Sequence, residues 1–241
     1  MFAGMRTAVL GLSLMAGLAS AALAQDQAAD SISGRVVYDG TPPTRKKINP
    51  STDPHCMEMH ANDPLMEDSL VVGEDGGVRY VFVEVVGGLP KGKTYDPPPT
   101  PVTLDQRGCM YAPHVIGVQA GQSIEVVNDD DTNHNVHGMP RANKVFNKGQ
   151  AKRGMRDDFM MTQPEIFRIR CDVHGWMDGW FYGADNPYYA VTEKDGSFKL
   201  TDVPPGSYTV EVWHEKLGKS TQKVTVKAKE DAKVNFEMAG K

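Results

Sequence analysis

The stretch 167–180 constrains the fold most, because it places a thiol, an imidazole and a thioether three residues apart, at Cys171, His174 and Met177. In the run before it, apolar residues alternate with arginines up to the cysteine. This period of two predicts a half-buried β-strand that delivers the cysteine to its end. A thiolate, an imidazole and a weak thioether are the ligands that a mononuclear electron-transfer copper site selects, provided that a second histidine arrives from elsewhere.

The candidate for this second histidine is His134. It follows a predicted strand at 123–127 and a polar turn, and the chain between it and Cys171 is long enough to return beside the cysteine. His137 lies three residues further on, and we expect it outside the ligand set, near the ligands or in solvent. The segment 55–60 also gathers two histidines and two methionines, so a second copper site there stays open.

Residues 1–24 are expected to be a signal peptide. Arg6 precedes the apolar run 8–22, and small residues flank the expected cleavage point after Ala24. The mature protein would then be periplasmic or secreted, and no later segment is apolar enough to predict a membrane span. The formal net charge of −5 argues against nucleic acid, which requires a basic surface.

An exported chain with three cysteines leaves one over once two have paired. Cys56 and Cys109 both lie in turn-like surroundings, whereas Cys171 lies at a strand end among residues that bind metals. We therefore expect a disulfide between Cys56 and Cys109 and a thiolate at Cys171, which a bound metal would protect from oxidation. The alternative, in which Cys171 takes part in the disulfide, stays open.

The chain as a whole is expected to be all-β, because short alternating runs and turn signals recur and no long stretch has helical periodicity. Two domains are expected. The first, 25–187, holds the metal-ligand residues and a proline-rich irregular excursion at 41–64. The second, 188–241, is a small β-sandwich that contains an Asp-Gly hairpin turn at 195–196.

The second unit resembles the transthyretin-like (prealbumin-like) or carboxypeptidase-regulatory modules of exported proteins. The resemblance is carried by Phe198, the turn Val203-Pro-Pro-Gly206 and the strand Tyr208-Thr-Val210. The segment 32–40 resembles the opening strand of such a module, so the N-terminal part of the chain is expected to pair with this sheet. The resemblance also implies a possible contact with a glycan or a protein.

The runs His134-Asn-Val-His137 and Cys171-x-x-His174-x-x-Met177 resemble the copper site of the cupredoxins, and most closely the amicyanin and plastocyanin-like group. The resemblance covers roughly residues 102–182 and implies a Greek-key β-sandwich around one copper ion, Cu(I) or Cu(II). Isoleucine at 169 and Gly175-Trp176 depart from the residues usual in the family. The ligands that it implies are His134, Cys171, His174 and, as a long axial ligand, Met177.

Two further residues are expected close to these ligands. Asn135 matches the family's position whose backbone N–H bonds the cysteine sulfur, and His137 would lie nearby without binding the ion. We expect the ring of His174 to present an exposed edge, surrounded by an apolar collar at which a redox partner protein docks. The collar residues would be Gly138, Met139, Gly175 and Trp176.

The leading hypothesis is therefore an exported type 1 copper protein that carries one electron and is not an enzyme. Copper oxidases need further histidines for dioxygen, and this chain contains no His-x-His pair. One alternative is a copper-handling protein that stores or delivers the ion and uses the segment 55–60. Another is a structural or carbohydrate-binding β-module with a vestigial metal site.

Overall fold

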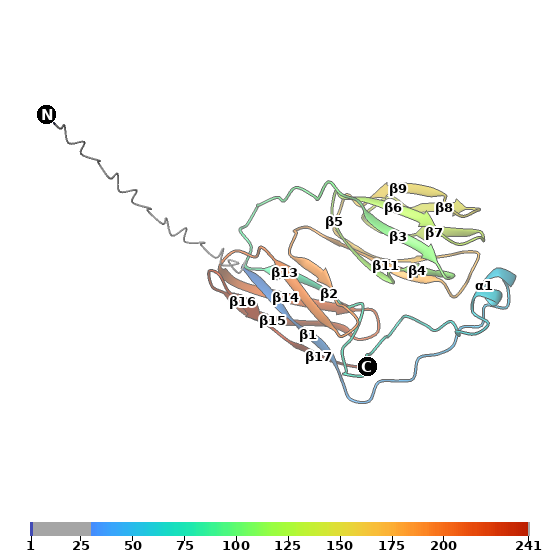
Figure 1. Cartoon of the computed structure of the whole chain (residues 1–241), viewed down its shortest axis with the longest axis horizontal. Helices are drawn as coiled ribbons and strands as arrows, with labels where there is room; N and C mark the ends of the chain where they lie inside the picture. Colours follow the sequence, from blue (N-terminus) through green and yellow to red (C-terminus); the bar gives the residue numbers. More distant parts are fainter. Residues whose placement is uncertain (2–29, 241) are drawn as a thin grey trace.

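Figure 1 shows the computed structural model of the chain, which describes Met1 and residues 30–240. Apart from Met1, the expected signal peptide lies outside these residues. The described part consists of β-strands and one short helix, which confirms the all-β fold class. None of its helices has the length and apolar character that a membrane crossing requires.

The middle of the chain forms a first β-sandwich, whose nine strands are β3 (Val102–Arg107), β4 (Met110–Ala112), β5 (Val115–Gln119), β6 (Ser123–Asn128), β7 (His134–Gly138), β8 (Phe146–Gln150), β9 (Arg156–Met160), β10 (Ile166–Arg170) and β11 (Asp178–Ala184). One sheet has the order β5-β11-β10-β7-β8 and the other β4-β3-β6-β9. Buried apolar side chains of both sheets form one core. On β10, Phe167 and Ile169 are buried and the two arginines are exposed, as the alternation predicts.

The second β-sandwich is built from strands of both the N-terminal and the C-terminal parts of the described chain. Its strands are β1 (Ser31–Asp39), β2 (Phe82–Gly87), β12 (Tyr189–Val191), β13 (Ser197–Thr201), β14 (Gly206–His214), β15 (Gly218–Val226), β16 (Asp231–Lys233) and β17 (Phe236–Ala239). One sheet contains β13-β1-β16 with β17 paired to β1, and the other has the order β12-β2-β14-β15. The expected pairing of the segment 32–40 with this sheet is confirmed.

This arrangement differs from two domains that follow one another along the sequence. β1 and β2 precede the first sandwich in the chain but belong to the second, so the first sandwich is inserted between β2 and β12 (Figure 1). The residues of β1 and β2 carry little indication that these strands pair with strands that come much later in the chain. A boundary drawn near residue 187 from turn residues therefore does not describe the membership of the sheets.

The two sandwiches meet through buried and half-buried aromatic side chains. Phe82 of β2 stacks on Tyr182 of β11 with ring centroids 3.5 Å apart, and Trp213 of β14 lies edge-on to Tyr182 and Trp180. Such aromatic pairs add to the stability that burial of their apolar area provides. The junction is therefore part of the folded core.

The irregular excursion after β1 contains α1 (Pro54–Met59), a helix that the pattern of apolar residues does not predict. Asp53 is its N-cap and accepts hydrogen bonds from the backbone N–H groups of His55 and Cys56. A capping residue followed by proline is a known signal for a helix start. The expected Cys56–Cys109 disulfide is present and ties α1 to the turn between β3 and β4. Figure 1 shows α1 at the strand ends of the first sandwich.

Glu84 is a buried carboxyl group near the junction, with 8% of its surface exposed and an amide hydrogen bond from Asn186. Burial, with Asp185 and Glu211 nearby, raises the pKa of Glu84 to about 7. In unfolded chains the pKa of glutamate is about 4.3. The folded state therefore binds more protons than the unfolded state between these two values. The stability that Glu84 contributes is fully present below the lower value and falls as pH rises through the higher one.

Replacing Glu84 by glutamine, which stays neutral, should remove this dependence. We expect the free energy of unfolding of the wild type, relative to Glu84→Gln, to fall by roughly 3 kcal/mol as pH rises from about 4.5 to about 7.5. Urea unfolding at a series of pH values measures this difference. The exposed Glu237 on β17 supplies the control Glu237→Gln. Parallel stability curves for the wild type and Glu84→Gln would contradict the assignment.

Candidate metal centre

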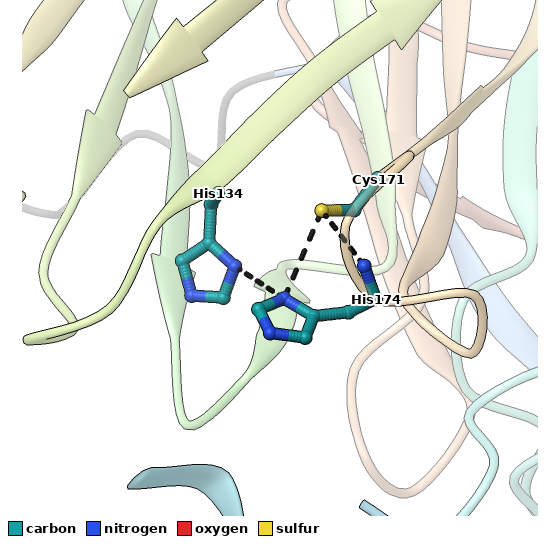
Figure 2. A group of neighbouring side chains, drawn as sticks. All are labelled: His134, Cys171 and His174. Atoms are coloured by element: carbon teal, nitrogen blue, oxygen red, sulfur yellow. Dashed lines mark hydrogen bonds between the residues drawn. The ribbon is translucent and has the colours of Figure 1, made fainter. Parts of the chain in front are cut away.

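Three buried donor side chains meet beside the core of the first sandwich (Figure 2). His134 begins β7, Cys171 follows β10, and His174 lies in the loop from β10 to β11. A ring nitrogen of each histidine and the sulfur of Cys171 all lie within 4.8 Å of one another. Nδ1 of His134 is 2.9 Å from Nδ1 of His174, which is 3.8 Å from Cys171 Sγ. β7 and β10 are antiparallel neighbours, and this pairing brings the distant residues together.

The three side chains are almost completely inaccessible, with exposed fractions of 0%, 3% and 1% for His134, Cys171 and His174. Cys171 is also the free cysteine of the described chain, since the other two form the disulfide. The structure thus brings together three of the four ligands that the sequence predicts. A buried thiol between two imidazoles is a donor set rather than an apolar packing arrangement.

The loop that carries His174 is closed by backbone hydrogen bonds. The N–H of Cys171 donates to the carbonyl of Met177, and the N–H of Met177 donates to the carbonyl of His174, each at 2.9 Å. The N–H of His174 points to Cys171 Sγ at 3.4 Å. Met177, the fourth expected ligand, is 1% exposed and packs in the same apolar core as Cys171.

Two aspartates orient the histidine rings, and the sequence pattern predicts neither contact. Nε2 of His134 lies 2.9 Å from Asp130, and Nε2 of His174 lies 3.1 Å from Asp53. A carboxylate that accepts the Nε2 proton fixes the tautomer and leaves the Nδ1 lone pair for a metal ion. Asp130 lies four residues before His134 in a run of three aspartates, and Asp53 precedes a proline. These sequence positions are the features that could have pointed to the two aspartates.

The charges of the cluster suit a cation. Burial alone would raise the pKa of the Cys171 thiol, but hydrogen bonds from His134, from His174 and from the backbone N–H of Asn135 outweigh it and lower the pKa to about 6. Burial alone would lower the pKa of His134, but Asp130 and Cys171 raise it to about 9. Without a metal ion, the cluster therefore favours a thiolate beside an imidazolium. A soft thiolate with two imidazoles fits copper, which would replace the proton.

Asn135 and His137 surround the cluster without belonging to it. The side-chain oxygen of Asn135 accepts from the N–H of Asp172 at 2.6 Å, which fixes the backbone directly after the cysteine. Nδ1 of His137 lies 2.9 Å from Asp172, and His137 is not among the three donor residues.

The expectation that His174 presents an exposed edge is wrong, because its side chain is only 1% exposed. The excursion folds over it. Besides the contact from Asp53, Cys56 Sγ lies 3.9 Å from Nε2, and the ring of Trp176 lies 5.0 Å from the imidazole centroid. Of the expected collar residues, Gly138 is buried against the rings of Phe146 and Phe167, whereas Met139 and Gly175 are exposed and Trp176 is half-buried.

In the segment 55–60, both ring nitrogens of His60 already have partners. The ring nitrogens of His60 face two backbone carbonyl oxygens, of Asp63 at 3.1 Å and of Gly108 at 2.9 Å. Met57 and Met59 are largely exposed on α1. His60 therefore serves to hold the excursion against the turn that carries Cys109.

Comparisons with known proteins give one family model and a set of solved structures. A family model described as "Carboxypeptidase regulatory-like domain" matches residues 183–239. No curated protein matches the chain. Among solved structures, the copper-containing nitrite reductase NirK from Thermus scotoductus SA-01 is 21% identical, at a TM-score of 0.35, over 42% of this chain and 26% of the reductase. The chain thus spans about a quarter of that enzyme.

Two smaller proteins are also similar to this chain. A purple cupredoxin from Nitrosopumilus maritimus is 19% identical over 34% of this chain and 99% of its own, with a TM-score of 0.31. A mutant of amicyanin in the Cu(I) state is 14% identical over 42% of this chain and 98% of its own, with a TM-score of 0.32. These are coarse likenesses of fold, and the chemistry of the site follows from its own residues.

Asp53 should hold the start of α1 in place, because its side chain caps the helix and contacts His174 and Thr132. Loss of such a cap costs about 1 kcal/mol, which is roughly fivefold in an opening equilibrium. We expect Asp53→Ala to speed hydrogen exchange at the amides of His55 and Cys56 by at least this factor. The exposed Asp63 gives the control Asp63→Ala. Unchanged exchange in Asp53→Ala would show that the disulfide alone holds the segment.

Proposed function

We propose that this chain is an exported type 1 copper protein that binds one copper ion and carries one electron. The observation that carries the proposal is the convergence of a buried free thiol, Cys171, with the Nδ1 atoms of His134 and His174. Copper in such a site would supply a Cu(I)/Cu(II) couple that needs little rearrangement of its ligands. The buried Met177 is proposed as the weak axial ligand.

The residues of the chain have three tasks in this proposal. Asp130 and Asp53 hold the two rings with Nδ1 directed inward, so the ligand geometry does not depend on the ion. The N–H groups of Asn135 and His174 stabilise the thiolate of Cys171. Burial of the cluster excludes water, which protects the sulfur from oxidation and fixes the ligands in both oxidation states.

The same burial supports a carrier rather than an enzyme. An enzyme needs an open position at which a substrate binds the metal, and here Asp53, Cys56 and Trp176 cover His174. An electron needs no such opening. The proposed partner is a redox protein that docks over α1, where Met57 and Met59 are exposed on either side of Glu58 and Cys56 contacts the ligand ring. Contact of the second sandwich with a glycan or a protein stays a prediction.

Cys171→Ser tests the proposal directly. A hydroxyl is a poor substitute for a thiolate toward copper, so the intense thiolate-to-copper absorption should disappear. Copper affinity should fall by more than the roughly 10–100-fold that removal of an outer partner costs. Visible spectra and competition with a chelator measure both. His137→Gln, on the same strand as His134, is the control and should keep colour and affinity. Unchanged binding in Cys171→Ser would place the copper elsewhere.

Met177→Leu tests the axial ligand. The substitution removes a weak sulfur donor that favours Cu(II), so the colour should remain and the reduction potential should rise. Cyclic voltammetry of the copper-loaded protein gives the potential. Met161 is equally buried in the same core, and Met161→Leu controls for packing. Equal potentials in Met177→Leu and Met161→Leu would remove Met177 from the ligand set.

A further inference from the structure

The Cys56–Cys109 disulfide lies directly against the metal centre. Sγ of Cys56 is 3.9 Å from Nε2 of His174, the ring nitrogen that faces away from Cys171. Each half of the disulfide belongs to a group of metal-binding side chains whose donor atoms lie within 4.8 Å of one another, and each group includes one histidine and one carboxylate of the centre. These groups are Asp53, Cys56 and His174, and Cys109, Asp130 and His134.

The donor atoms therefore continue from the first site into a second one. Each sulfur lies with one carboxylate oxygen and one ring nitrogen of the centre inside the same 4.8 Å group. As a disulfide, Cys56 and Cys109 are bonded to each other. As thiolates they would be strong ligands for a soft ion.

We propose that, in its dithiol form, the chain binds a second Cu(I) ion between Cys56 and Cys109, beside the first site. The choice of copper rests on the proposed function. Asp53 and Asp130 lie within reach of the two sulfurs and complete the surroundings. The second ion is held only while the two sulfurs are reduced, so the oxidation state of this pair sets the copper capacity of the chain at two ions or one.

The change between the two forms is an ordinary thiol–disulfide exchange. A protein dithiol reduces the S–S bond by transferring two electrons and two protons, and itself becomes a disulfide. Cu(I) then displaces the two protons from Cys56 and Cys109. In the reverse direction, a protein disulfide accepts the two electrons from the thiolates together with two protons from water and becomes a dithiol, the Cys56–Cys109 bond forms again, and the Cu(I) ion leaves.

Access decides when the dithiol form exists. Both sulfurs are fully buried in the disulfide form, so a reductant reaches them only when the segment around α1 moves away. The dithiol form is also the state of every chain before the disulfide has formed. The second site thus fits uptake of copper by the newly made chain. When the disulfide forms, the second ion leaves and the excursion closes over the ion in the first site.

The test is an anaerobic Cu(I) titration of the full chain against a coloured Cu(I) chelator, in the disulfide form and after reduction and removal of the reductant. Alkylation and mass measurement count the free thiols, and circular dichroism checks that the reduced chain stays folded. We expect one tightly held ion in the disulfide form and two in the dithiol form. Cys56→Ser/Cys109→Ser should bind one ion under both conditions. Cys171→Ser should bind one ion tightly only when it is reduced.

A dithiol form that binds no more Cu(I) than the disulfide form would overturn the second site and leave the proposed function intact. So would a double variant that binds as much as the reduced wild type. A disulfide form that binds no copper would instead overturn the proposed function. The comparison of the two forms of the wild type needs no variant, so it decides the question even if the double variant does not fold.

Discussion

The structure depends on two buried histidine rings that face each other beside a thiol. Their Nδ1 atoms are 2.9 Å apart, and two lone pairs at this distance repel unless a proton or a metal ion lies between them. Burial of such groups is costly unless each polar atom has a partner. Here Asp130 and Asp53 bond the outer nitrogens, and the N–H of His174 points to the sulfur of Cys171. The remaining lone pairs converge on one point, which is the requirement for a metal site.

The scaffold supplies these groups from segments far apart in the chain. The β7–β10 pairing brings His134 to Cys171, and the short loop after β10 returns His174 past the sulfur. The excursion then covers the centre, with Asp53 serving both as the cap of α1 and as the partner of His174. The Cys56–Cys109 disulfide fixes this cover across a sequence separation of 53 residues. This segment therefore shields the centre, orients the ring of His174 and contributes Cys56, one of the two disulfide sulfurs.

The sequence predicts the parts of this centre that have local signals. Alternation before Cys171 predicts β10, and the spacing and chemistry of Cys171, His174 and His134 predict the donor set that the structure brings together. The disulfide follows from the surroundings of the cysteines. Asp53 and Asp130 escape prediction because their contacts depend on how the excursion and the turn before β7 pack. The predicted exposure of His174 fails for the same reason, and the place of β1 and β2 in the second sandwich depends on pairings across most of the chain.

The most direct measurement is a crystal structure of the copper-loaded chain with diffraction data collected on both sides of the copper absorption edge. We expect one strong anomalous peak within bonding distance of Cys171 Sγ and of Nδ1 of His134 and His174, with Asp53 and Asp130 still on the outer nitrogens. A peak at the segment 55–60 with the three donors unchanged would contradict this expectation. So would a protein that crystallises with copper and shows no peak at the cluster.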